Sequence, residues 1–158
     1  MLSATALATC GLPAIGHAAC TVTPAGALPL QVICDPGIGE TIGITPSNGV
    51  FIHSGLVVSI NQGSNPAYFE MTGGRLDELN QGGSLDIFLM TGGQITGTVM
   101  AGDFADMRGG QVGAFNLQAA DNGFHMTGGD IDRFLYAQTG DDYFQLDGGT
   151  IAFDAIGG

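Results

Sequence analysis

Aspartate recurs in this sequence two residues before an aromatic position that itself recurs at regular intervals. The positions of this Asx column are Ala67, Asp86, Asp103, Asn122 and Asp142. Because Ca²⁺ prefers carboxylate and carbonyl oxygens, the candidate calcium ligands are Asp86, Asp103, Asp141 and Asp142. The alternative is an Asx turn, in which each side chain accepts a hydrogen bond from the next backbone N–H. We favour the turn, so calcium is a candidate cofactor but no cofactor is expected.

A second acidic set suggests sugar hydrolysis, which uses two carboxylates at a fixed separation. Its members are Asp77 and Asp132, with Glu78 and Asp130 beside them and with Arg75 and Arg133 as possible ion-pair partners. Asp77 and Asp132 are expected three repeats apart, about 14 Å at the spacing of neighbouring strands, which is too far for a catalytic pair. No Ser-His-Asp order emerges either, so we predict no catalytic residues and a protein that is not an enzyme.

Cys20 and Cys34 lie close together in the sequence, and a disulfide between them would close a short loop. Such a disulfide would stabilise the fold by about 3 kcal/mol. Two unrelated thiols are the alternative, and we favour the disulfide. A metal site is not expected, because His17, His53 and His125 lack ligand-like spacing to the cysteines.

The elements that position these side chains repeat along the chain. Glycine pairs recur at spacings of 19, 17, 19 and 20 residues, and apolar residues recur at fixed offsets from each pair. Columns of this kind indicate an internal repeat. The pairs, which we expect to form structural corners, are Gly73 and Gly74, Gly92 and Gly93, Gly109 and Gly110, Gly128 and Gly129, and Gly148 and Gly149.

Three apolar columns keep the same offset from these corners. The Phe column comprises Phe69, Phe88, Ala105, Phe124 and Phe144. The Met column comprises Met71, Met90, Met107, Met126 and Leu146. The Ile column comprises Leu76, Ile95, Val112, Ile131 and Ile151. A fourth, looser column is predicted at Leu79, Val99, Phe115, Phe134 and Phe153.

The repeat predicts stacked β-coils. Phe-x-Met has the period of two that a strand with one buried face requires, and Gly-Gly then supplies positive φ for a corner. Stacking the repeats places every apolar column in one continuous interior. We therefore predict an all-β fold, a right-handed parallel β-helix (β-solenoid) with coils of 17–20 residues. The varying coil length and the lack of a hexapeptide rhythm favour the right-handed form.

Composition agrees with an extended, exported protein. The chain has 158 residues, of which 44% are hydrophobic and 28 are glycine. Fifteen acidic residues face three basic ones, and the formal net charge of −12 repels phosphate backbones, so no nucleic-acid partner is expected. Tyr68, Tyr136 and Tyr143 are candidates for part of a sugar-binding face.

The chain divides into three regions. Residues 1–19 are predicted to be a signal peptide, because they are apolar and end in small residues that suit signal peptidase. Residues 20–48 are expected to form an N-terminal cap region that carries the cysteine pair. Residues 49–158 are expected to form the coils, with "FIHSG" using Ser-Gly in place of Gly-Gly and with the last coil truncated at the C-terminus.

The repeats "GDDYFQLDGGTI", "ADNGFHMTGGDI" and "DIFLMTGGQITGTV" resemble those of bacterial autotransporter (type V secretion) passenger domains, whose pattern is Gly-Asp-Asp-x-Phe-x-Met-x-Gly-Gly-x-Ile. The opening "ACTVTPAGALPLQVICD" resembles the Cys-pair start of such passengers after their signal peptide. The resemblance covers residues 67–156 in repeat detail and the rest of the chain in outline.

The resemblance implies export to the cell surface of a Gram-negative bacterium, or secretion from it. The partner that it implies is an outer-membrane β-barrel downstream of this chain, and a host-surface or glycan ligand is a further possible partner. We expect a non-enzymatic passenger that acts as a stalk or an adhesin-like module. The alternatives are a polysaccharide-active β-helical lyase or hydrolase and a calcium-stabilised secreted repeat module.

Overall fold

A computed structural model describes residues 20–23, 31–34, 40–43, 49–53, 55–63, 67–82 and 85–156. These residues form β-strands joined by turns and bends. None of them belongs to a helix of the length and apolarity that crossing a membrane requires. The predicted signal peptide, residues 1–19, lies outside the described part of the chain.

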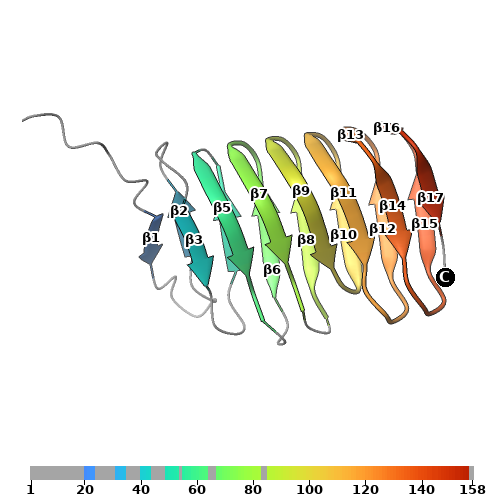
Figure 1. Cartoon of the computed structure of the whole chain (residues 1–158), viewed down its shortest axis with the longest axis horizontal. Helices are drawn as coiled ribbons and strands as arrows, with labels where there is room; N and C mark the ends of the chain where they lie inside the picture. The colour runs from blue at the N-terminus through green and yellow to red at the C-terminus, as the bar shows by residue number, and fades with distance from the viewer. Residues whose placement is uncertain are drawn as a thin grey trace, which may run out of the picture.

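One wall of the fold is a parallel sheet of six strands, each of four residues (Figure 1). Its strands, in the order in which they pair, are β4 (Gly49–Ile52), β6 (Tyr68–Met71), β8 (Ile87–Met90), β10 (Phe104–Met107), β12 (Gly123–Met126) and β15 (Tyr143–Leu146). Each strand comes from a successive coil, so equivalent residues of the repeat lie side by side along the stack.

The opposite wall is a parallel sheet of nine strands. Along its main path lie β3 (Glu40–Gly43), β5 (Leu56–Asn61), β7 (Arg75–Asn80), β9 (Gln94–Ala101), β11 (Gln111–Leu117), β13 (Asp130–Ile131) and β16 (Thr150–Ile151). Two further strands, β14 (Phe134–Ala137) and β17 (Asp154–Ile156), continue the sheet from the second half of β11. Because β3 pairs with β5, this sheet extends into the region predicted as the cap.

An antiparallel pair lies at the N-terminal end of the stack (Figure 1). It consists of β1 (Cys20–Thr23) and β2 (Gln31–Cys34), and its register places Cys20 opposite Cys34. Directly opposed residues of antiparallel strands have Cα atoms about 4.5–5.5 Å apart, and disulfides typically join Cα atoms about 4.4–6.8 Å apart. The backbone pairing is compatible with the disulfide, which stays a prediction.

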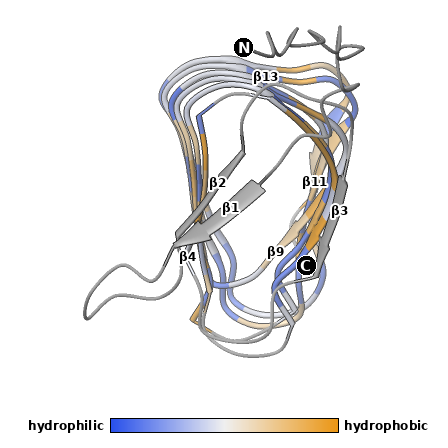
Figure 2. Ribbon diagram, turned by 90° about the vertical axis from the view of Figure 1, so that its left-hand side faces the viewer, coloured by the Kyte–Doolittle hydropathy of each residue, from blue (hydrophilic) through white to orange (hydrophobic). Residues whose placement is uncertain are grey.

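The predicted fold class, a parallel β-helix, is confirmed. Figure 2 looks along the stack and shows successive coils following nearly the same path around one interior. The Phe, Met and Ile columns pair residue for residue, as predicted, and the members up to Ile131 are buried. The predicted "FIHSG" coil is also present, since Val50 pairs with Phe69, Ile52 pairs with Met71 and Gly55 has a φ of 91°.

The Phe column contains one substitution that the opposite wall compensates. Ala105 leaves a space between the rings of Phe88 and Phe124, and Phe115 of β11 fills it from the other sheet. The ring of Phe115 lies 5.0 Å from that of Phe88 and 5.1 Å from that of Phe124, with edge-to-face geometry in both contacts. The interior thus stays filled although the repeat loses an aromatic residue at position 105.

The fourth column is wrong in its last two members. Leu79, Val99 and Phe115 pair as predicted, but the next residues in register are Leu135 and Ala155. Leu135 is fully buried, whereas Phe134 is 39% and Phe153 is 74% exposed. The error arises because the segment between the corner and this column varies in length from coil to coil, with register shifts between Leu76 and Leu79 and between Val112 and Ala114.

The glycine pairs form the predicted corners. The first and the second glycine of a pair are required for different reasons. The second glycine of each pair has positive φ, between 80° at Gly74 and 92° at Gly129. The first glycine lies against a carbonyl oxygen of the preceding coil; a Cβ at Gly92 would lie 2.6 Å from the Thr72 oxygen. The Met column packs beneath the next corner, where a Cβ at Gly93 would lie 2.7 Å from Met71 Cε.

Candidate functional site

The Asx column is a ladder of hydrogen bonds between coils. The backbone N–H of Ala67 donates to Asp86 Oδ1 at 2.9 Å, and the N–H of Asp86 donates to Asp103 Oδ2 at 3.1 Å. The N–H of Asp103 then donates to Asn122 Oδ1 at 2.9 Å, and the N–H of Asn122 to Asp142 Oδ1 at 3.1 Å. Each side chain therefore accepts from the equivalent residue of the preceding coil.

This arrangement corrects the Asx-turn prediction, in which the donor was the next residue of the same coil. It also bears on the calcium candidates, since Asp86, Asp103 and Asp142 each use one carboxylate oxygen as a backbone acceptor. The fourth candidate, Asp141, donates its own N–H to Asp121 Oδ1 at 2.9 Å. No three His, Cys, Asp or Glu side chains of the described residues are placed to hold one metal ion.

The second acidic set is distributed over separate coils. Asp77 lies on β7, and Asp132 follows β13, with β9 and β11 between them in the sheet. As predicted, Arg75 pairs with Asp77, with 3.2 Å between Nε and Oδ1. Arg133 instead donates to the carbonyl oxygen of Gly113 at 3.2 Å.

The other acids of this set lie in similar surroundings on the surface. Asp132 Oδ1 accepts from Gln111 Nε2 at 3.0 Å, and Asp130 accepts from the Thr150 hydroxyl. These acids are therefore partners of polar side chains along the outer surface of the nine-stranded sheet.

A polar cluster that the sequence analysis missed lies on the outer face of the six-stranded sheet. We call it the His125 cluster; its members are Asp106, Arg108, His125, Gln145 and Asp147. Arg108 donates to Asp106 Oδ2 through Nε at 2.9 Å and through Nη2 at 2.6 Å. His125 Nδ1 lies 3.5 Å from Asp106 Oδ1, and its Nε2 lies 3.1 Å from Asp147 Oδ2.

The cluster couples the charges of three successive coils. The hydrogen bond of Asp147 with His125, followed by its hydrogen bond with Gln145, holds the pKa of the Asp147 carboxyl below the ordinary value. The hydrogen bond and charge of Asp106 raise the pKa of Arg108 further. Both ring nitrogens of His125 face carboxylates, so the imidazole bridges two acids and does not direct a nitrogen at a substrate.

Aromatic and apolar side chains lie beside this cluster on the same face. Tyr68, Ile87, Phe104, Gly123 and Tyr143 occupy one register position across five strands, which we call the aromatic column. The hydroxyl of Tyr68 donates to Glu70 Oε2 at 2.7 Å. Burial, followed by the hydrogen bond and charge of Glu70, raises the pKa of Tyr68 to about 12, so the phenol remains a donor at neutral pH.

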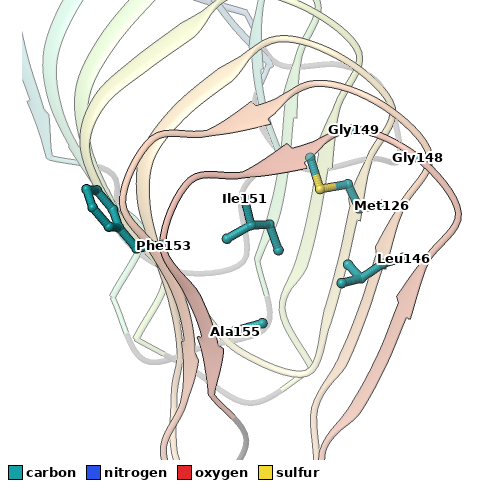
Figure 3. A pocket seen from close by; sticks show the side chains of 7 residues that line it. All are labelled: Met126, Leu146, Gly148, Gly149, Ile151, Phe153 and Ala155. Atoms are coloured by element: carbon teal, nitrogen blue, oxygen red, sulfur yellow. The ribbon is translucent and has the colours of Figure 1, made fainter.

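A pocket of about 220 Å³ lies at the C-terminal end of the described coils (Figure 3). Its lining side chains are apolar and come mainly from the interior columns. The lining residues are Met126, Leu146, Gly148, Gly149, Ile151, Phe153 and Ala155. The pocket is therefore the exposed end of the interior columns at the last described coil, without the convergent polar side chains of a small-molecule site.

Column analysis of outward positions could have found the missed residues. Asp106 and His125 follow the Phe column by one residue, and Arg108 and Asp147 follow the Met column by one residue. The inward columns and the acids ahead of them have a clear periodicity, whereas these outward positions vary in residue type from coil to coil, so periodicity alone does not reveal the partners of His125. No known protein family, curated protein or solved structure matches this chain.

Proposed function

We propose that this chain is an exported β-helical module, displayed at the cell surface as an adhesin-like part of an autotransporter passenger. The observation that carries the proposal is the geometry of the solenoid, in which short corners join two long parallel sheets. Such a fold offers extended outer faces for binding, because its interior is filled by side chains. The described coils are regular, which suits a spacer that also carries a binding face.

Charge and chemistry narrow the class of partner. The formal net charge of −12 disfavours nucleic acids and anionic lipid surfaces. The outer face of the six-stranded sheet combines exposed apolar side chains with the His125 cluster. A neutral partner with both apolar surfaces and hydrogen-bonding groups fits this composition.

The cysteine register supports export. Cys20 and Cys34 are opposed in the β1–β2 pair, and disulfides form and persist in oxidising compartments outside the cytosol. The predicted signal peptide would deliver the chain to such a compartment.

Surface display can be tested by labelling intact cells that produce the full-length protein. Thr139 lies at an exposed corner, so we expect Thr139→Cys to react with a membrane-impermeant maleimide on intact cells. Ala137→Cys is the matched control, because Ala137 is fully buried two residues away and should react only after unfolding. Labelling of Thr139→Cys only after lysis would rule out surface display. A second control lacks residues 1–19 and should lose surface labelling.

A further inference from the structure

The aromatic column alternates along the stack. Aromatic rings occur at every second coil, at Tyr68, Phe104 and Tyr143, and the coils between them carry Ile87 and Gly123. Phe104 is 46% and Tyr143 is 64% exposed, although both lie on strands whose alternate residues face the core. Neighbouring strands are about 4.8 Å apart, so the backbone positions of successive aromatic residues are separated by about 10 Å.

Each aromatic residue has a hydrogen-bonding side chain two positions further along its strand. Tyr68 is followed by Glu70, Phe104 by Asp106 and Tyr143 by Gln145. Both tyrosine hydroxyls donate to these neighbours, Tyr68 to Glu70 at 2.7 Å and Tyr143 to Gln145 at 3.3 Å. The outer face thus offers a ring beside a polar group at Tyr68 and Glu70 and again at Tyr143 and Gln145, with the exposed ring of Phe104 and the buried Asp106 between them.

We infer that this face binds a neutral, extended β-1,4-linked hexopyranose chain that lies along the solenoid axis, with alternate sugar rings on Tyr68, Phe104 and Tyr143. In such a chain successive sugars are turned over, so every second sugar presents the same face. The chain advances per sugar by about one coil rise, and an aromatic ring at every second coil therefore meets equivalent sugar faces. Glu70 and Gln145, which accept from the tyrosine hydroxyls, supply hydrogen-bonding groups beside two of the rings. Asp106, in contrast, is buried and engaged by Arg108 and His125.

Charge favours this occupant over others. A polymer with carboxylate or phosphate groups would be repelled by a chain of net charge −12, and so would a second copy of this chain. A neutral glycan carries no such penalty, and its hydroxyls can donate to the carboxylates of the face. An α-1,4-linked glucan such as maltohexaose coils and cannot follow a straight column over five strands.

The inference rests on the proposed function and specifies the ligand of its binding face. It can be tested by calorimetric titration of the purified chain with cellohexaose and chitohexaose, with maltohexaose and polygalacturonate as comparison ligands. We expect binding of at least one of the two β-1,4-linked probes and of neither comparison ligand. Phe104→Ala and Tyr143→Ala should each weaken that binding by about tenfold, the loss typical of a contacting aromatic anchor.

Phe134→Ala and Tyr136→Ala are the matched controls, because both aromatic residues are similarly exposed but belong to β14 of the other sheet. They should leave binding unchanged, and thermal melting should show that all four variants fold. No binding of either β-1,4-linked probe at millimolar concentration would overturn the inference, as would equal losses in test and control variants. Preference for maltohexaose or polygalacturonate would also overturn it.

The two proposals fail separately. Surface labelling at position 139 without glycan binding would remove the glycan inference and leave surface display standing. Glycan binding by a chain that is labelled only after lysis would remove surface display and leave the binding face.

Discussion

Phe115 takes the place of an aromatic residue that belongs, by the repeat, at position 105. It contacts the rings of Phe88 and Phe124 from the opposite sheet and is fully buried. Positions 105 and 115, on different sheets, therefore share one volume in the core. The residue that fits at one of them depends on the size of the residue at the other.

Exchange of this pair should show strong coupling. Phe115→Ala is expected to lower the free energy of unfolding by about 3–5 kcal/mol because it leaves a large cavity. Ala105→Phe alone should cost about 1–3 kcal/mol through overpacking. Combined with Phe115→Leu, the same Ala105→Phe change should be less harmful, since the ring then occupies the usual Phe column. Urea unfolding of the single and double variants measures this coupling, and additive losses would contradict shared volume.

Asp147 should lose stabilisation in acid because of its contact with His125. A carboxyl whose folded pKa is lowered contributes stability above its ordinary value of 3.8, and that contribution is lost as the pH falls through the folded pKa. His125→Gln should return the pKa of Asp147 towards the ordinary value. NMR titration of the Asp147 carboxyl carbon measures the shift. Thr127→Ala, at the equivalent position one coil earlier, should leave it unchanged, and identical titrations of the wild type and His125→Gln would count against the contact.

The glycine corner combines two requirements that substitution can separate. Gly93 has a φ of 88° and lies against the Gly73 oxygen and Met71 Cε, whereas Gly63 has a φ of 71° with open space around it. Gly63→Ala should therefore cost only the conformational strain, about 1–2 kcal/mol. Gly93→Ala should lower the free energy of unfolding clearly more than Gly63→Ala, because the corner must also move away from the preceding coil.

Gly123→Ala serves as the control for this comparison. Gly123 is in a strand, and an added Cβ would lie 3.3 Å from the ring of Phe104. The expected change in the free energy of unfolding is under about 1 kcal/mol. If Gly93→Ala and Gly63→Ala proved equally destabilising, close packing of coils at the corner would not be the reason for the glycine pair.

Asn122 tests the ladder between coils. Besides accepting from the Asp103 N–H, it donates through Nδ2 to the carbonyl oxygens of Gln118 and Ala120, both at 2.7 Å. Asn122→Ala should lower the free energy of unfolding by about 1–3 kcal/mol and speed hydrogen exchange at the Asp103 amide, because buried groups lose their partners. Asp121→Ala, an exposed neighbour, should have a smaller effect. Unchanged exchange at Asp103 would show that the hydrogen bond is absent in solution.

The fold of the stack could be predicted from the sequence because five coils repeat the same inward residues. The Phe, Met and Ile columns and the corners could be aligned on the glycine pairs alone. The fourth column could not be aligned in this way, since its distance from the corner changes from coil to coil. Phe134 is also larger than Leu135 and therefore resembles a core residue more closely in the sequence. The Asx column was recognised, but a turn within a coil and a bond between coils have the same sequence signature.

Calcium dependence is also a property of the whole stack. We expect the melting midpoint to be the same with millimolar calcium and with chelator, because the column aspartates already accept backbone hydrogen bonds. An ion bound at a hundred times its Kd would stabilise the fold by about 2.7 kcal/mol, which would raise the midpoint by several degrees. A rise of that size would favour the alternative of a calcium-stabilised secreted repeat module.

The interlocking of coils has a consequence for how such a protein can evolve. Each coil receives the Met side chain of the preceding coil beneath its glycine corner and supplies an Asx acceptor to that coil in return. An extra coil duplicated from within the stack would find the same two partners above and below it. Length can therefore change by whole coils, about 4.8 Å at a time, without redesign of the contacts. The number of repeat copies in the gene therefore sets the length of the solenoid.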